Sequence, residues 1–108
     1  MSPSLSIYIP DSVIEILPQA FSFSLNLKSV RLPEKLEHLQ NNVFRGCERL
    51  QHIEIPDSVS SINNDTFADC ITLETVILPK SLDTMGSSFN GCEQLRYIYI
   101  PENARQIN

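Results

Sequence analysis

The amino-acid sequence predicts a mainly β solenoid of about four coils, each 23 residues long, with parallel strands stacked from coil to coil. Three observations lead to this fold class. The phrase CERLQHIEIPDSV at 47–59 returns as CITLETVILPKSL at 70–82 and as CEQLRYIYIPENA at 92–104. Anchor residues of five types keep one period along the chain. Apolar and polar residues alternate ahead of each repeated proline, which is the period of a β-strand.

The period is clearest in the prolines, which are 23, 23, 23 and 22 residues apart: Pro10, Pro33, Pro56, Pro79 and Pro101. The phenylalanines keep the same steps: Phe21, Phe44, Phe67 and Phe89. One residue is missing near Met85-Gly86, and every anchor beyond that point shifts together. Each period is therefore one structural unit, and stacking lets each coil cover the apolar face of the last.

A strand precedes the proline in each coil. In Ile53-Glu54-Ile55 we expect the isoleucines to point inward and Glu54 outward, because successive side chains of a strand face opposite sides. The proline has no N–H to donate, so the strand ladder ends there and the chain turns. The expected inward pairs on the five strands are Ile7/Ile9, Val30/Leu32, Ile53/Ile55, Val76/Leu78 and Ile98/Ile100.

Two shorter features complete each coil. Apolar pairs after the proline, such as Val59/Ile62, predict a second short extended segment. The spacing Phe44-x-x-Cys47-x-x-Leu50 is that of a helical turn with the Phe and Cys side chains buried. Each coil is therefore predicted to contain two extended segments and one short helical turn.

Residues 1–108 are predicted to form a single domain. An opening half-repeat runs to Pro10, and a closing half-repeat, with Ile107 in an inward position, follows Pro101. The full repeats end near Pro33, Pro56, Pro79 and Pro101. Neither end has the polar cap that a solenoid needs to cover its terminal coils. We expect either a segment of a longer array or ends that pair with another copy of the chain.

Composition narrows the function classes. The net charge is −5, and the eight Lys and Arg residues are scattered, whereas nucleic-acid binding needs clustered basic residues. No apolar run approaches the roughly 20 residues of a membrane-spanning helix. The first twenty residues contain Asp11, Glu15 and prolines where a signal peptide has a continuous apolar stretch. The chain is expected to begin inside the folded region, either of a cytoplasmic protein or of one whose leader has been removed.

The motif LxxIxIP, followed by [S/K][V/L]xxI and then FxxC, resembles the BspA-like leucine-rich repeat, also called the Treponema pallidum type, over nearly the whole chain. The resemblance implies a leucine-rich repeat solenoid used for protein–protein contact. It also implies a cell-surface or secreted location, because such repeats are common in adhesion proteins of bacteria and some parasitic protists. The sequence departs from the pattern in two places. Only Gly86 supplies the usual glycine after the second segment, and Phe23-Ser24 replaces Gly-Cys in the first coil.

The sequence contains no catalytic, metal-binding or cofactor-binding set. Cys47, Cys70 and Cys92 are in phase and are predicted to form a ladder of buried, reduced thiols that behave as small hydrophobic residues. An odd number of cysteines without CxxC spacing disfavours a disulfide framework or a zinc site. His38 and His52 stand alone in their columns, so we expect solvated surface histidines. The chain is predicted not to be an enzyme and to need no cofactor.

The outward side chains of the strands carry the candidate partner-binding residues. One outward column contains Tyr8, Arg31, Glu54, Ile77 and Tyr99. The column two residues earlier contains Ser6, Ser29, His52, Thr75 and Tyr97. All three tyrosines lie in these columns, and Tyr and Arg are enriched at interface hot spots. The predicted protein-binding face consists of Tyr8, Arg31, His52, Glu54, Ile77, Tyr97 and Tyr99.

Other interpretations of these columns stay open. Aromatic and β-branched residues favour strands in any case, so the same side chains can stabilise the sheet without binding a partner. The chain can also be a structural spacer within a longer repeat array, with no binding face of its own. Arg31 and Glu54 lie on adjacent coils, where an exposed ion pair between them would contribute under about 1 kcal/mol.

Overall fold

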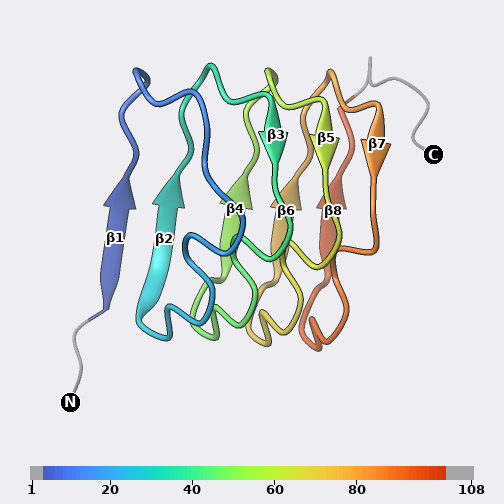
Figure 1. Cartoon of the computed structure of the whole chain (residues 1–108). Coiled ribbons are helices and arrows are strands. Elements are labelled where there is room, and N and C mark those ends of the chain that lie inside the picture. Colours follow the sequence, from blue (N-terminus) through green and yellow to red (C-terminus); the bar gives the residue numbers. More distant parts are fainter. Residues whose placement is uncertain (1–3, 102–108) are drawn as a thin grey trace.

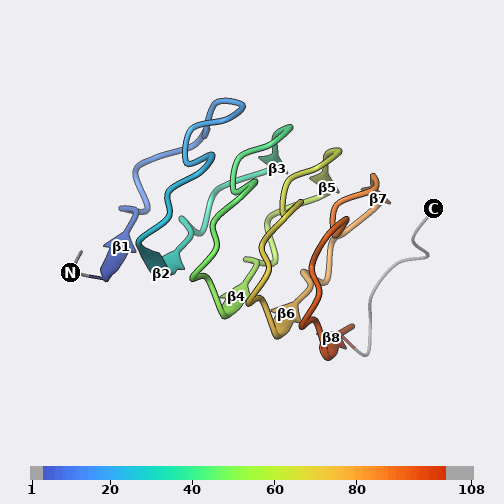
Figure 2. The same ribbon diagram turned by 90° about the horizontal axis from the view of Figure 1, so that it is seen from below.

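The computed structural model describes residues 4–101 and contains eight short strands on two faces of a solenoid (Figure 1). The first face consists of β1 (Leu5–Tyr8), β2 (Leu27–Arg31), β4 (His52–Glu54), β6 (Thr75–Ile77) and β8 (Tyr97–Tyr99). The second face consists of β3 (His38–Leu39), β5 (Ser61–Ile62) and β7 (Thr84–Met85). The strands of the two faces run in opposite directions, because the chain turns back after each proline (Figure 1). Successive coils lie side by side, with the two faces on opposite sides (Figure 2).

The strands pair in parallel with partners one period away. In the sheet of β4, β6 and β8, Ile53 pairs with Val76, and Val76 pairs with Ile98. In the sheet of β3, β5 and β7, Leu39 pairs with Ile62. These registers confirm the predicted solenoid of about four 23-residue coils.

The core lies between the two faces and contains most of the predicted inward columns. Val59 and Ile62 of the second segment are at most 1% exposed. The phenylalanine rings of successive coils stack with their centroids 5.6 or 5.7 Å apart and their planes nearly parallel: Phe21, Phe44, Phe67 and Phe89. Such stacked ring pairs stabilise a core beyond the area that they bury. The phenylalanine column therefore runs through the solenoid along its axis.

Ile98 and Ile100 depart from the predicted inward pattern, because they are 42% and 61% exposed. The pairing of Ile98 with Val76 keeps the expected register. No coil of the described region lies beyond β8, so nothing there covers these two side chains. The predicted closing half-repeat after Pro101 lies outside the described residues.

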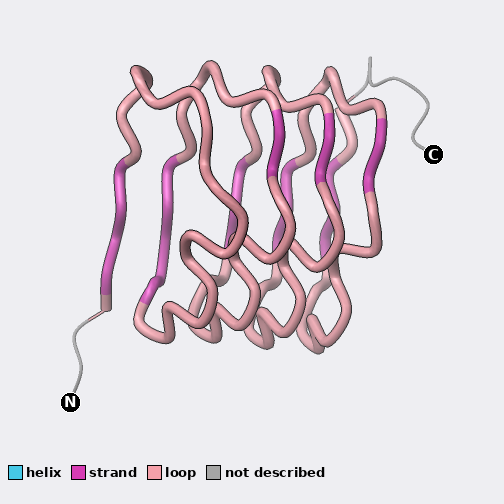
Figure 3. The backbone as a smooth tube through the Cα atoms, in the orientation of Figure 1, coloured by secondary structure: helices cyan, strands magenta, loops and turns pink. Residues whose placement is uncertain are grey.

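The predicted helical turn at Phe44-x-x-Cys47 is an isolated turn, and residues 4–101 contain no helix (Figure 3). The Cys47 N–H donates to the Phe44 C=O within the turn at 3.2 Å, whereas the Phe44 N–H donates to the Thr66 C=O of the next coil at 2.9 Å. Asn42 and Gly46 have φ angles of 62° and 72°, which interrupt a helix and which Asn and Gly adopt readily. We use the name turn ladder for the cross-coil bonds donated by residues 19–23, 42–46 and 65–69.

Phe23, which departs from the repeat pattern, occupies the position in its coil that Gly46 occupies in the next coil. Its φ of 58° is unfavourable for a bulky residue. Its ring lies so close to Gly46 that a Cβ added there would come within 2.4 Å of a ring carbon. Gly46 thus has two reasons to be glycine, the positive φ and the neighbouring ring.

The three cysteines are free thiols, and each donates to the carbonyl oxygen of the phenylalanine one coil earlier. The donor–acceptor pairs are Cys47 to Phe21 at 3.2 Å, Cys70 to Phe44 at 3.1 Å and Cys92 to Phe67 at 3.0 Å. Burial raises the pKa of the Cys47 thiol to about 11 and also raises the pKa of Cys70 and of Cys92. Cys47 and Cys70 are buried and Cys92 is half-buried, so the predicted ladder of reduced thiols is present.

The first face is interrupted between β2 and β4. β1 and β2 form a sheet separate from that of β4, β6 and β8, and the gap between β2 and β4 is wider than the gap between β4 and β6 (Figure 1). The turn ladder continues past this point, because the Phe21 N–H donates to the Val43 C=O at 3.0 Å. We call the interruption the strand break.

Candidate protein-interaction face

The outward columns are in register within each sheet of the first face. On one side of the strand break, Tyr8 pairs with Arg31. On the other side, the pairings run from Glu54 through Ile77 to Tyr99 and from His52 through Thr75 to Tyr97. The strand break therefore divides the seven candidate residues into two groups: Tyr8 and Arg31; and His52, Glu54, Ile77, Tyr97 and Tyr99.

Arg31 interacts with the first coil and with its own turn. Its guanidinium carbon lies 4.6 Å from the centre of the Tyr8 ring, a cation–π geometry. Its nitrogens lie 2.9 Å from Asp11 Oδ1 and 3.3 Å from Glu34 Oε1. The Arg31 hydrogen bond, followed by that from the Glu34 N–H, lowers the pKa of Asp11. The suggested ion pair between Arg31 and Glu54 is wrong, because Arg31 is held on the far side of the strand break.

A cluster of exposed apolar and aromatic side chains lies on β6 and β8. We call Ile77, Tyr97 and Tyr99 the tyrosine patch; these side chains are 38%, 54% and 54% exposed. The two tyrosine rings stack with their centroids 6.1 Å apart and an interplanar angle of 23°. Ile98 and Ile100 add exposed apolar surface at the edge of β8. The sequence does not predict the exposure of Ile98 and Ile100, because the repeat pattern marks both side chains as inward. Their position in the last coil of the pattern was the sequence feature that could have indicated this exposure.

His52 and Glu54 lie on β4, between the tyrosine patch and the strand break. Both are exposed, and Glu54 forms no ion pair within residues 4–101. His38 lies on the second face, where its Nδ1 is 2.7 Å from Ser61 Oγ, and so it is no part of this surface. The candidate face thus combines aromatic rings with an unpaired carboxylate.

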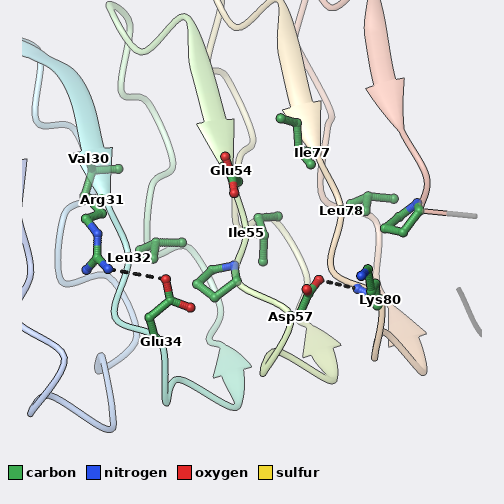
Figure 4. Close-up of a pocket in the computed structure, with 12 residues that line it drawn as sticks. Val30, Arg31, Leu32, Glu34, Glu54, Ile55, Asp57, Ile77, Leu78 and Lys80 are labelled. Atoms are coloured by element: carbon green, nitrogen blue, oxygen red, sulfur yellow. Dashed lines mark hydrogen bonds and ion pairs between the residues drawn. The ribbon is translucent and has the colours of Figure 1, made fainter. Parts of the chain in front are cut away.

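A cleft of about 440 Å³ opens at the strand break and extends over the proline turns (Figure 4). Val30 and Leu32 line it on the β2 side, and Glu54 and Ile55 line it on the β4 side. It continues past Asp57 to the later coils. Sequence reasoning did not predict this cleft, because the repeat pattern is uniform across it.

The three cysteine thiols lie in surroundings that disfavour their ionised form. The raised pKa values keep the thiols protonated at neutral pH, and a thiol is a poor nucleophile. Within residues 4–101, no group of three or more His, Cys, Asp and Glu side chains is arranged to hold a metal ion. No helix in that region has the length and apolar character needed to cross a membrane.

The stacked strands and the repeated phenylalanine and proline positions define a leucine-rich repeat protein. The model of the BspA type leucine rich repeat region, in six copies, matches residues 3–108. The chain therefore belongs to the BspA-type leucine-rich repeat family.

Two solved structures are similar to this chain. A leucine rich cell surface protein from Faecalibacterium prausnitzii A2-165 matches 88% of the chain with a TM-score of 0.85 and 33% identity, and the chain covers 25% of that structure. A leucine-rich repeat protein from Bacteroides ovatus ATCC 8483 matches 94% of the chain with a TM-score of 0.61 and 30% identity. The chain covers 33% of this second structure. No functionally curated protein matches the sequence significantly.

Proposed function

We propose that this chain is a non-enzymatic module that binds a protein partner through the tyrosine patch and the outward side chains beside it. The observation that carries the proposal is the exposure of Ile77, Tyr97 and Tyr99 together on adjacent strands. Exposed aromatic clusters of this kind are typical of interface hot spots.

Two physical features support the binding of a partner over a role limited to stabilising the sheet. Tyrosine side chains have few rotatable bonds, so ordering them at an interface costs little conformational entropy. The rings of Tyr97 and Tyr99 already stack on each other, which lowers that cost further. Each ring also has a hydroxyl that can hydrogen-bond at a partly wet interface.

We further infer a role in adhesion at a cell surface. The protein from Faecalibacterium prausnitzii that matches this chain is named a cell surface protein. In a protein outside the cytoplasm, a contact face of this kind would engage proteins of the surroundings or of a host.

The test is capture of a partner from host and self extracts by the wild-type chain and by Tyr97→Ser/Tyr99→Ser. The matched control is Ile14→Ser/Leu17→Ser, because those side chains are 69% and 64% exposed and lie outside the outward columns. We expect the tyrosine variant to fold and to lose the captured protein, while the control retains it. Equal capture by all three chains would contradict the proposed face.

A structural spacer is the second candidate. The observation in its favour is that the chain covers only a quarter to a third of the similar structures. A spacer would capture nothing, and replacement of Tyr97 and Tyr99 would then lower the melting temperature without changing any interaction.

A further inference from the structure

The turn ladder ends at the last turn of the described region, and this leaves the Gly91 N–H without an acceptor within residues 4–101. Gly91 occupies the position that Gly46 occupies two coils earlier, and the two residues have φ angles of 78° and 72°. The Gly46 N–H donates to the Ala68 C=O of the next coil at 2.8 Å. No turn of a later coil lies within the described region, so the Gly91 N–H is open at the end of the ladder.

The residue before this open N–H is an asparagine, and Asn90-Gly91 is the only Asn-Gly pair in the sequence. The Asn90 side chain is exposed. Its Nδ2 donates to Asp65 Oδ1 at 3.4 Å, a long hydrogen bond that holds the amide weakly. The peptide group between Asn90 and Gly91 is held on one side, because the Asn90 C=O accepts the Asp69 N–H at 2.7 Å.

We propose that Asn90-Gly91 is a site of spontaneous deamidation that the open end of the turn ladder makes reactive. The Gly91 nitrogen attacks Asn90 Cγ, and the bond from Cγ to Nδ2 breaks. The proton of the Gly91 nitrogen leaves with the Nδ2 amino group as ammonia, which closes a cyclic succinimide. Water then adds to either carbonyl carbon of the ring and leaves aspartate or isoaspartate at position 90. Water is the only co-reactant.

The structure favours the attack in two ways. Gly91 has no Cβ to hinder the approach to its nitrogen. An N–H that is bonded to the next coil must first break that bond before its nitrogen can turn toward the side chain, so its reaction waits for local opening. The Gly91 nitrogen needs no such step, because its N–H has no acceptor within the described residues.

The product would loosen the last turn of the ladder. A carboxylate would replace the Asn90 Nδ2 group that donates to Asp65, and two negative charges would then lie side by side. Isoaspartate would also lengthen the main chain by one methylene, because its peptide bond runs through the former side chain. The turn leads into β8, so the change would reach the coil that carries Tyr97 and Tyr99. The inference does not depend on the proposed function.

Arg45→Asn provides a matched control within the chain. It creates a second Phe-Asn-Gly-Cys segment, identical to that of residues 89–92, so the intrinsic rates of the two segments are equal. In the new segment the glycine N–H is bonded to the Ala68 C=O. Arg45 is partly exposed, and its nitrogen lies 3.6 Å from Asp69 Oδ2, so its replacement should cost little stability.

The test is incubation of the full Arg45→Asn chain at neutral pH, with aspartate and isoaspartate at positions 45 and 90 quantified by peptide mapping and mass spectrometry. We expect position 90 to convert at least about tenfold faster than position 45 in the folded chain. The two positions should convert at equal rates in urea. The wild type provides a second measurement: conversion of Asn90 in the folded chain should be within about threefold of its rate in urea.

Two results would overturn the inference. One is an Asn90 that stays intact in the folded wild type while the chain in urea converts. The other is conversion of positions 45 and 90 at equal rates in an Arg45→Asn chain that amide hydrogen exchange shows to be folded, because the open N–H would then not determine the reaction. Neither result affects the proposed function, which is tested by capture that depends on Tyr97 and Tyr99.

Discussion

Phe67 lies between two other rings of the phenylalanine column and is completely buried. Replacing it with alanine removes these ring contacts and leaves a cavity between coils that cannot close without breaking the turn ladder. We therefore expect Phe67→Ala to lower the free energy of unfolding by about 3–5 kcal/mol, measured by urea denaturation.

The control for this prediction is Phe23, which is 61% exposed and has an unfavourable φ. Phe23→Gly should be neutral or stabilising, because glycine relieves backbone strain of about 1–3 kcal/mol while little ring burial is lost. If Phe67→Ala proves near-neutral, the phenylalanine column is not the core.

Cys47 gives a prediction of pH dependence. Its pKa is about 11 in the folded chain against 9.0 for an unperturbed thiol. Because the folded-state pKa is raised, the stabilisation is complete below about pH 9 and is lost as the pH rises toward 11. The two pH units correspond to a fall of about 3 kcal/mol in the free energy of unfolding.

The measurement is urea denaturation of the wild type and of Cys47→Ala at several pH values from 8 to 11. We expect the alanine variant to be less stable than the wild type below pH 9 and to show a shallower fall in the free energy of unfolding above pH 9. Parallel curves would show that the Cys47 thiol does not titrate differently in the two states.

At the scale of the elements, the strands and the turn segments differ in how well the sequence predicts them. The alternation in Ile53-Glu54-Ile55 and the proline after it are local signals, and β4 forms where they place it. The helical turn is different, because Phe44 and Cys47 have helical spacing but Asn42 and Gly46 have positive φ. Asn and Gly favour positive φ, and this was the sequence feature that could have indicated an isolated turn in place of a helix. The cross-coil hydrogen bonds of the turn ladder stabilise that turn.

The two groups of residues on the candidate face also differ in how well the sequence predicts them. The repeat period predicts that Tyr97 pairs with Thr75 and Tyr99 with Ile77, because residues one period apart lie side by side in a solenoid. The direction of Arg31 follows from its bonds to Asp11 and Glu34. We expect the strand break to depend on side-chain reach as well, since Glu34 differs by one methylene from Asp11 and Asp57, whose carboxylates accept a backbone N–H of the next coil. A repeat pattern treats Asp and Glu alike and cannot show this difference.

Glu34→Asp tests this explanation. The shorter side chain should accept a hydrogen bond from the Asp57 N–H and bring β4 closer to β2. The Leu32 N–H should then donate to the Glu54 C=O, a bond that is absent from the structure. We expect slower amide exchange at Leu32 and a gain of about 0.5–1 kcal/mol in the free energy of unfolding. Loss of the exposed ion pair to Arg31 should cost less than this gain. Unchanged exchange at Leu32 would show that Glu34 does not cause the strand break.

At the scale of the whole molecule, the coil of β8 has an uncovered end. Ile98 and Ile100 are exposed, and β8 has no strand partner on its outer edge within the described region. Such an edge is a template for pairing with another chain. We predict concentration-dependent dimers in sedimentation velocity experiments.

Ile98→Lys/Ile100→Lys should shift these dimers to monomers, because charged side chains block edge-to-edge pairing. Ile14→Lys/Leu17→Lys is the matched control and should leave the dimers unchanged. A wild-type chain that stays monomeric from micromolar to millimolar concentration would contradict pairing through this end.

The most direct test of the proposed function is the footprint of a captured partner on the wild-type chain, measured by hydrogen exchange with mass spectrometry. We predict slowed exchange in peptides that contain β6 and β8, with the change concentrated at residues 75–77 and 97–99. The second face, at β3, β5 and β7, should exchange at the same rate in the free and bound chain. Protection on the second face alone would contradict the account, because the partner would then bind without the tyrosine patch.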